Sequence, residues 1–214
     1  DLKSNLRMFR ILQGDVGSGK TIVAAIAAIN TIESGYQCGL MAPTAILAEQ
    51  HFKLLKRLIN QSNLNINIEL LTGKTDPKKR KKILIDLLNK KINFLIGTHA
   101  LFQKTISFKK LGLIIIDEQH KFGVQQRIKF AKKGGVNCDV LLLSATPIPR
   151  TMMMSIYGDM DSSKLEEKPI HRQKTLTLSK PENKINELWP FLEKKIINNE
   201  QIFWVCPLIE ESKK

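Results

Sequence analysis

Near its start the chain reads Gly14-Asp15-Val16-Gly17-Ser18-Gly19-Lys20-Thr21, which fits the template G-x-x-x-x-G-K-[ST] at every fixed position. An apolar segment over residues 9–13 precedes this loop and is predicted to be a strand, and an aliphatic segment over residues 22–32 follows it as a predicted helix. In that setting the glycines let successive backbone N–H groups turn toward one point, which the positive end of the helix also faces. We therefore predict that all eight residues form a phosphate-binding loop at the start of an α/β domain.

Two side chains of this loop have expected tasks of their own. Lys20 would place its ammonium on the β- and γ-phosphates of a nucleoside triphosphate, and Thr21 would offer its hydroxyl to Mg²⁺. The alternative is a glycine-rich turn that binds nothing, because a motif match can arise by chance. The other motifs of the chain weigh against that alternative.

Short apolar strands alternate with helices along the rest of this region. Strands are expected over residues 36–41, 66–71, 92–96, 111–116 and 140–143, and helices over residues 45–60, from Pro77 onward and over 125–133. Thr44 and Asp76 are the expected N-caps of the first two of these helices. This alternation predicts a parallel sheet that helices cover on both faces.

Polar clusters follow the predicted strands at their carboxyl ends. They are the phosphate loop, Pro43-Thr44, Gly97-Thr98-His99, Asp117-Glu118-Gln119-His120 and Ser144-Ala145-Thr146. The carboxyl edge of an open parallel sheet is where such folds bind ligands. We therefore expect the five clusters to line one site.

The acidic cluster supplies the groups that hydrolysis of a nucleoside triphosphate requires besides a phosphate loop. We assign Asp117 as the metal-side carboxylate and Glu118 as the general base that takes the proton of the attacking water. Gln119 and His120 are expected to contact the γ-phosphate or to relay its state. The alternative is an acidic pair that ends a strand in solvent, beside a histidine with a structural role.

Two hydroxyl residues, Ser144 and Thr146, end the next predicted strand. We expect them to couple the nucleotide state to movement, with capping of the following turn as the alternative. His99 has no partner motif, and a structural role for it is equally compatible with the sequence.

The net charge of +14 and the pI near 9.7 suit a polyanionic partner. However, Lys outnumbers Arg 27 to 7, a bias that an AT-rich genome would also produce. The run Lys78-Lys79-Arg80-Lys81-Lys82 opposes the dipole of the helix that it begins. For this run a solvated face is favoured over phosphate contact.

Composition also limits the class of protein. Cys38, Cys138 and Cys206 are far apart in the sequence without a C-x-x-C pair, so we expect buried free thiols in a reducing cytoplasm rather than a metal site or disulfides. No apolar run approaches the roughly 20 residues that span a bilayer, so we expect no membrane segment. Because the chain begins with Asp1 and not Met, we interpret it as an internal piece of a longer protein.

The pattern weakens after residue 158, which divides the chain into three expected parts. Residues 1–158 are the first α/β domain, and residues 159–180 are a linker or peripheral strand. Residues 181–214 are interpreted as the start of a second α/β domain, with a helix over 182–198 and a strand over 201–206.

Together these motifs resemble the first motor domain of superfamily-two helicases, and most closely the RecG-type ATP-dependent DNA helicases. The stretches that carry this resemblance are Gln13-Gly14-Asp15-Val16-Gly17-Ser18-Gly19-Lys20-Thr21, Met41-Ala42-Pro43-Thr44, Leu47-Ala48-Glu49-Gln50-His51, Gly97-Thr98-His99-Ala100, Ile116-Asp117-Glu118-Gln119-His120-Lys121-Phe122-Gly123-Val124, Ala145-Thr146-Pro147-Ile148-Pro149-Arg150-Thr151 and Cys206-Pro207-Leu208-Ile209-Glu210-Glu211-Ser212. The resemblance covers essentially the whole chain.

The resemblance implies a RecA-like P-loop NTPase domain followed by the truncated start of a second RecA-like domain. It implies a monomeric cytoplasmic enzyme that uses ATP and Mg²⁺ to translocate on double-stranded and branched DNA, at stalled replication forks, in recombination and repair. DNA would be held without regard to base sequence by Pro43-Thr44, Thr72-Gly73 and Gly97-Thr98-His99. Without the family's flanking parts, the fragment is expected to hydrolyse ATP poorly.

Two alternatives stay open at this point. The transcription-repair coupling factor shares the Gly-Asp-Val-Gly loop, although it usually has Glu where Gln119 stands. A nucleotide-dependent DNA-binding module without motor activity is the alternative of a different class. The chain also departs from the RecG-type pattern at Ala45, where an acidic residue is usual, and at Pro169-Ile170-His171-Arg172, where Pro-Pro-Gly-Arg is usual.

Overall fold

The computed structural model of the protein describes residues 2, 6–103, 105–117, 138–146, 160–167 and 176–205. The chain divides into two compact units, residues 1–170 and residues 171–214, and each is described by itself. The predicted helix over residues 125–133 lies outside the described residues.

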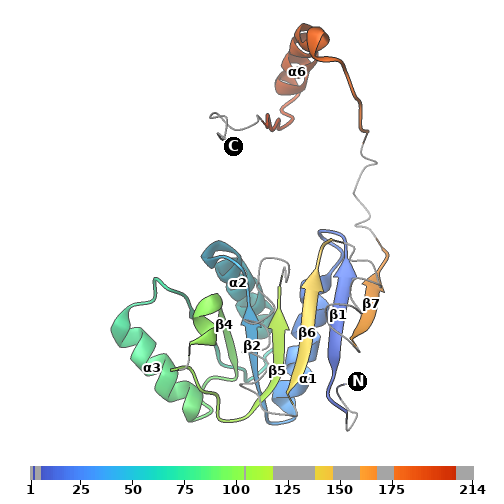
Figure 1. Ribbon diagram of the computed structural model, residues 1–214. Helices are drawn as coiled ribbons and strands as arrows, with labels where there is room; N and C mark the ends of the chain where they lie inside the picture. The colour runs from blue at the N-terminus through green and yellow to red at the C-terminus, as the bar shows by residue number, and fades with distance from the viewer. Residues whose placement is uncertain are drawn as a thin grey trace, which may run out of the picture. The chain divides into compact units, whose positions relative to one another are not determined.

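The first unit is built on a seven-stranded, all-parallel sheet (Figure 1). Its elements in chain order are β1 (Phe9–Gly14), α1 (Lys20–Glu33), β2 (Gln37–Met41), α2 (Ala45–Gln61), β3 (Ile68–Leu71), α3 (Pro77–Leu88), β4 (Phe94–Gly97), the 3-10 helix η1 (His99–Phe102), β5 (Leu111–Ile116), β6 (Asp139–Ser144) and β7 (Asp161–Leu165). The strands lie in the order β3-β4-β2-β5-β6-β1-β7. The six strands expected in this unit and the three expected helices that fall on described residues are confirmed.

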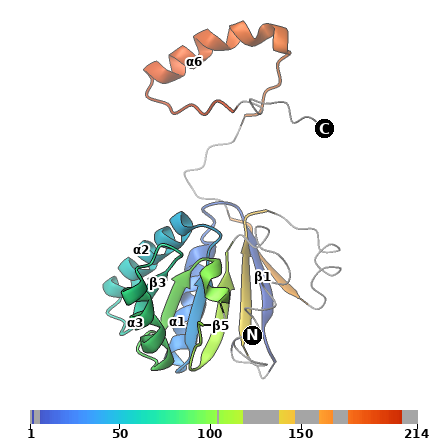
Figure 2. The ribbon, with the colours of Figure 1, turned by 60° about the vertical axis from the view of Figure 1, so that its left-hand side comes forward.

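The sheet is buried on both faces, as the prediction requires. One core layer joins Ala24, Ala28 and Ile32 of α1 and Ala48 and Leu55 of α2 to the sheet, and the other joins Ile83 and Leu87 of α3 to it. Neighbouring residues of β5 belong to opposite layers, which is why every residue of that strand is buried and nearly all are large and aliphatic. The helices around the sheet are visible in Figure 2.

The strand ends are aligned, so the polar segments that follow them meet at one edge. Met41 lies opposite both Ile116 and Gly97, and Gln13 lies opposite Ser144. Leu71 of β3 is in register with Gly97 as well. The carboxyl edge of the sheet therefore carries the segments after β1 to β6.

The helix starts follow the predicted capping. Thr44 accepts a hydrogen bond from the backbone N–H of Leu47 at 3.2 Å, and Asp76 accepts one from that of Lys78 at 3.0 Å. Pro77 occupies the first turn of α3, where its missing N–H removes no helical hydrogen bond.

Residues 161–165 belong to the sheet and not to a linker. They form β7, which pairs in parallel with β1 from Arg10↔Asp161 to Gly14↔Leu165. The first unit accordingly extends to Ile170, beyond the predicted boundary at residue 158. The polar sequence Asp161-Ser162-Ser163-Lys164-Leu165 suits an edge strand, and of the two readings of this segment the peripheral strand is the one observed.

The second unit contains η3 (Glu182–Glu187) and α6 (Leu188–Ile197), which together cover the predicted helix. Lys184, within η3, has non-helical backbone angles, so η3 itself is kinked. The strand expected over residues 201–206 is wrong for residues 201–205, which form no β ladder. A strand requires a neighbour for its backbone hydrogen bonds, and the described part of this unit offers none.

Within the described residues, no helix combines the length and the apolar character that crossing a bilayer requires.

Candidate functional site

The phosphate loop joins β1 to α1 and contains two glycines with left-handed backbone angles. Gly17 has a φ of 82° and Gly19 a φ of 94°, values that favour glycine. The backbone carbonyl of Asp15 accepts a hydrogen bond from the N–H of Ser18 at 3.1 Å, and the carbonyl of Gly19 accepts those of Ile22 and Val23. The loop thus closes on itself and leads directly into α1.

The ammonium of Lys20 lies over the loop. Its Nζ donates to the carbonyl oxygens of Gly14 at 2.6 Å and Asp15 at 2.8 Å. Ser18 Oγ is buried and has no hydrogen-bond partner among the residues that the structure describes. A Cβ on Gly14 would collide with this hydroxyl and displace it. A cation and an unpaired buried hydroxyl within a glycine loop fit an anionic ligand such as a nucleotide phosphate.

Asp117 is the first residue after β5 and is held at two points. Its backbone N–H donates to the carbonyl of Met41 at 2.8 Å, and its Oδ2 accepts from Nε2 of His51 at 2.7 Å. Both side chains of the pair are buried, at 9% exposure for each residue. An ionised carboxylate only accepts hydrogen bonds, so Nε2 of His51 carries the proton. Glu118, Gln119 and His120 lie outside the described residues.

His51 is the main functional candidate that the motif analysis did not assign. It lies on the buried stripe of α2 together with Ala48, Leu55 and Ile59. The signal in the sequence is a polar side chain at helical spacing among apolar core residues, which calls for a buried partner. Spacing alone does not identify that partner, because Asp117 is 66 residues further along the chain.

Ser144 ends β6, the strand that lies between β5 and β1. Its buried Oγ donates to the carbonyl of Thr146 at 3.0 Å and lies 3.2 Å from the Thr146 hydroxyl. These contacts are those of the local turn. A role of both residues in coupling stays a prediction.

The segments predicted to hold DNA follow β2, β3 and β4, which form the other half of the carboxyl edge, away from the phosphate loop. Thr44, Gly73 and His99 are exposed, whereas Thr72, Gly97 and Thr98 are buried. Thr72 holds a tight turn, because its Oγ1 accepts from the backbone N–H of Lys74 at 3.3 Å and its own N–H donates to Thr75 Oγ1 at 2.9 Å.

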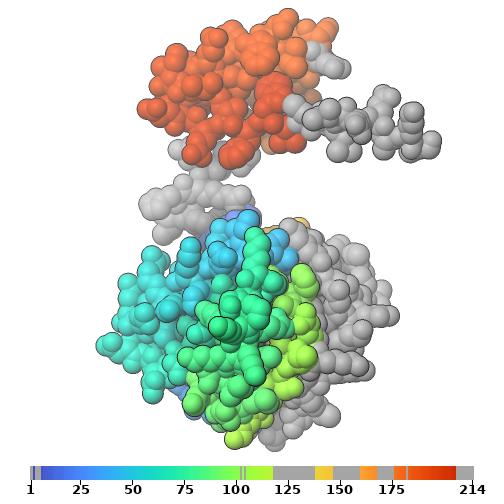
Figure 3. All heavy atoms as spheres, turned by 90° about the vertical axis from the view of Figure 1, so that its left-hand side faces the viewer, coloured from blue at the N-terminus to red at the C-terminus, as the bar shows by residue number. Residues whose placement is uncertain are grey.

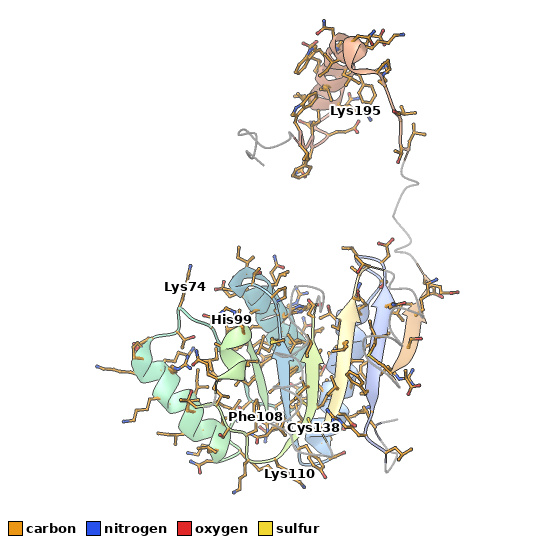
Figure 4. The ribbon with its side chains drawn as sticks, viewed as in Figure 1. Lys74, His99, Phe108, Lys110, Cys138 and Lys195 are labelled. Carbon is orange, nitrogen blue, oxygen red and sulfur yellow. The ribbon has the colours of Figure 1, made fainter. Side chains whose placement is uncertain are left out.

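Gly97 has a packing role at the same edge. A Cβ at this position would overlap the carbonyl oxygen of Leu71, so a residue without a side chain is required. Figure 4 shows Lys74 and His99 at the end of the sheet to which the strand arrows point, and Lys110 and Cys138 at the opposite end. The exposed residues Thr44, Gly73 and His99, with the partly exposed Pro43, are therefore the better candidates for direct contact.

The thiols lie away from this site. Cys38 and Cys138 are buried and free, as predicted, and Cys206 lies outside the described residues. Burial raises the pKa of Cys38 far above its ordinary value and that of Cys138 to about 12. Both thiols are therefore protonated and unreactive at neutral pH.

Comparison with known proteins shows which family the chain resembles. The family model of the DEAD/DEAH box helicases matches residues 5–155. Over 214 residues the chain is 46% identical to the ATP-dependent DNA helicase RecG of Thermotoga maritima and 47% identical to that of Bacillus subtilis. Each alignment covers 100% of this chain, but only 27% and 31% of the respective relative.

The chain is also similar in structure to a solved RecG. A RecG bound to a three-way DNA junction matches with a TM-score of 0.82 and 42% identity, over 98% of this chain and 28% of the matched one. The chain therefore spans less than a third of the length of these relatives.

Proposed function

Because the chain belongs to the DEAD/DEAH box helicase family, we propose that it is the first motor domain, with the start of the second, of a RecG-type ATP-dependent DNA helicase. The observation that carries this proposal is the shared edge of one parallel sheet. The phosphate loop follows β1 and the buried Asp117 follows β5, with Ser144 on the strand between them. The identity with RecG proteins over the whole chain supports the RecG type.

The nucleotide half of the edge would bind ATP with Mg²⁺. The backbone of residues 14–21 and the Lys20 ammonium hold the phosphates, and Thr21 and Asp117 hold the metal ion. Bound Mg²⁺ supplies neutralisation of the charge on the phosphates. Glu118, next to Asp117, takes the proton of the attacking water, and Gln119 and His120 respond to the γ-phosphate.

The half formed by the ends of β2, β4 and β3 would hold DNA. Its exposed turns offer backbone groups and small polar side chains, which suit phosphates and carry no base preference. The substrate would be double-stranded and branched DNA, including stalled forks, in recombination and repair. We further propose that the enzyme acts as a monomer in the cytoplasm.

The experiment that tests this function uses the full-length protein with and without branched DNA. Wild-type ATP turnover should rise when DNA is added. Glu118→Gln should still bind ATP with Mg²⁺ but lose turnover, because the amide keeps the shape and cannot take a proton. Lys20→Ala should weaken binding itself, as titration calorimetry would measure.

The two variants separate the parts of the proposal. Turnover of Glu118→Gln close to that of wild type would remove Glu118 as the base. Unchanged ATP affinity of Lys20→Ala would remove the phosphate-loop assignment, and circular dichroism would check that both variants are folded.

A further inference from the structure

The turn between β2 and α2 is joined to Asp117 on both of its sides. On the strand side, the carbonyl of Met41 accepts the backbone N–H of Asp117 at 2.8 Å. On the helix side, His51 donates to the Asp117 carboxylate at 2.7 Å. Pro43-Thr44, the predicted DNA contact, lies within the segment that these two hydrogen bonds bracket.

The order of the strands places the contact between His51 and Asp117 at the boundary between the DNA half and the nucleotide half of the edge. The proposed DNA half consists of the ends of β3, β4 and β2, and the proposed nucleotide half of the ends of β5, β6 and β1. Within the described sheet, the two halves adjoin at the β2–β5 pair, where Met41 lies opposite Ile116. Asp117 follows Ile116 directly, so it is the nucleotide-side residue nearest to the DNA half in the sheet.

We propose that His51 is a positioning residue that orients the metal-side carboxylate of Asp117 from α2, and that DNA held at Pro43-Thr44 acts on the nucleotide site through this contact. The inference rests on the proposed function. It adds a positioning residue, His51, and a path by which bound DNA affects the nucleotide site. His51 itself contacts neither nucleotide nor DNA in this account.

The orienting role follows from the chemistry of a buried carboxylate. A carboxylate that ligates a metal ion through one oxygen is fixed in direction when its other oxygen accepts a hydrogen bond, and loss of such a partner typically weakens metal affinity or activity 10- to 100-fold. His51 fits this task, because its ring is itself held in the apolar layer between α2 and the sheet.

The route to DNA follows from the rigidity of α2. Thr44 caps the helix through Leu47, and His51 lies seven residues beyond Thr44, about 10 Å along the same helix axis. A phosphate at the exposed first turn would therefore move or fix His51 together with the helix. A displacement of even a fraction of an ångström would change a 2.7 Å hydrogen bond to Asp117.

The test uses two variants of the full-length protein that differ by one methylene group. In His51→Gln the side-chain amide nitrogen reaches the place of Nε2, whereas in His51→Asn it stops short of Asp117. Gln50→Asn, the same shortening at the exposed neighbouring residue, is the matched control. If His51→Asn does not fold, His51→Leu fills the buried space without a donor and replaces it.

The first measurement is the Mg²⁺ concentration that gives half-maximal binding of a fluorescent ATP analogue. His51→Asn should raise it about tenfold, whereas His51→Gln and Gln50→Asn should stay close to wild type. The second is the ratio of ATP turnover with and without branched DNA, which should fall in His51→Asn while DNA affinity, followed by fluorescence anisotropy, is unchanged.

A merely structural pair would behave differently. His51→Asn would then lower the melting temperature and leave both the Mg²⁺ requirement and the stimulation ratio unchanged, which overturns the proposal. If the Mg²⁺ requirement rose but stimulation did not change, the orienting role would hold and the route to DNA would be wrong. Wild-type turnover that ignores DNA would instead contradict the proposed function itself.

Discussion

At the scale of single residues, buried polar side chains connect segments that are far apart in the sequence. Gln37 is fully buried at the start of β2, and its amide makes four hydrogen bonds to backbone groups. Nε2 donates to the carbonyls of Leu87 and Ile92, each at 2.8 Å, and Oε1 accepts from the N–H groups of Lys109 and Lys110. One side chain thus joins the end of α3 to the segments that enter β4 and β5.

Replacement of Gln37 by Leu should destabilise the first unit strongly. The change keeps approximately the size of the side chain but removes four hydrogen bonds to backbone groups. The Leu87 carbonyl keeps the N–H of Lys90 as a donor, and each of the other groups that stays buried and unpaired costs about 1–3 kcal/mol. We expect a loss of at least about 3 kcal/mol in the free energy of unfolding, measured by urea denaturation of this chain. Gln61→Leu at the exposed end of α2 is the control, with a change within about 0.5 kcal/mol. Equal stability of both variants would contradict the role assigned to Gln37.

The residues of the phosphate loop could be identified from the sequence because their task fixes both residue type and spacing. Gln37 and His51 could not, because each acts through a partner 50 or more residues away. The sequence shows only that a polar residue interrupts an apolar pattern. The identity of the partner depends on how the strands and helices are ordered in space.

At the scale of elements, α3 carries five basic residues directly after Pro77, at the positive end of its own dipole. Asp76 caps the helix, and Nζ of Lys79 lies 3.5 Å from Oε2 of Glu69 in an ion pair. Lys78, Lys81 and Lys82 are exposed. The residues of α3 form part of the surface that faces the viewer in Figure 3. The run descends from the carboxyl edge along the helix, whereas Lys74 lies in the turn at the edge itself (Figure 4).

This difference in position predicts different effects on DNA binding. Lys74→Gln should lower the slope of log K against log salt by about one unit, as expected for one lost phosphate contact. The double replacement Lys81→Gln/Lys82→Gln should leave the slope nearly unchanged, because these side chains lie about 6 Å or more down the helix from its start. Fluorescence anisotropy of the full-length protein over a salt series measures both. A decrease of two units in the double variant would show that the run holds phosphates.

Elements with strong patterns were predicted from the sequence, and elements that depend on a neighbour were not. Alternating apolar runs marked β1 to β6, and Thr44 and Asp76-Pro77 marked two helix starts. The polar strand β7 is recognisable only beside β1, whose edge it covers. Residues 201–205 have the composition of a strand, but no strand lies beside them among the described residues of their unit.

At the scale of the whole molecule, the alternation of strands and helices predicted a parallel sheet with one ligand edge. The order of the strands in that sheet was not predictable, because a parallel crossover can place the next strand on either side. That order makes β2 and β5 neighbours and so brings His51 to Asp117. The arrangement within the edge is therefore a property of the topology and not of any one motif.

Over residues 176–205, the described part of the second unit, there is little buried core, in contrast to the first unit. None of the residues of α6 is buried, and it exposes large apolar side chains such as Phe191 and Ile197. Phe203 and Val205, after the helix, are exposed as well. Trp189 and Trp204 stack at 5.5 Å between ring centroids, yet they remain 52% and 49% exposed. An apolar surface of this kind is typical of a region that another part of a protein covers.

Tryptophan fluorescence would show whether a longer protein covers this surface. The chain has only two tryptophans and both belong to the second unit, so the emission reports on that unit alone. We expect the isolated chain to emit at long wavelength and to be quenched readily by acrylamide. A protein that contains the whole second motor domain should emit at shorter wavelength and be quenched less, because packing would remove both rings from water. If quenching of Trp189 and Trp204 were equally strong in the two proteins, the assignment of residues 181–214 to the start of a second packed domain would be wrong.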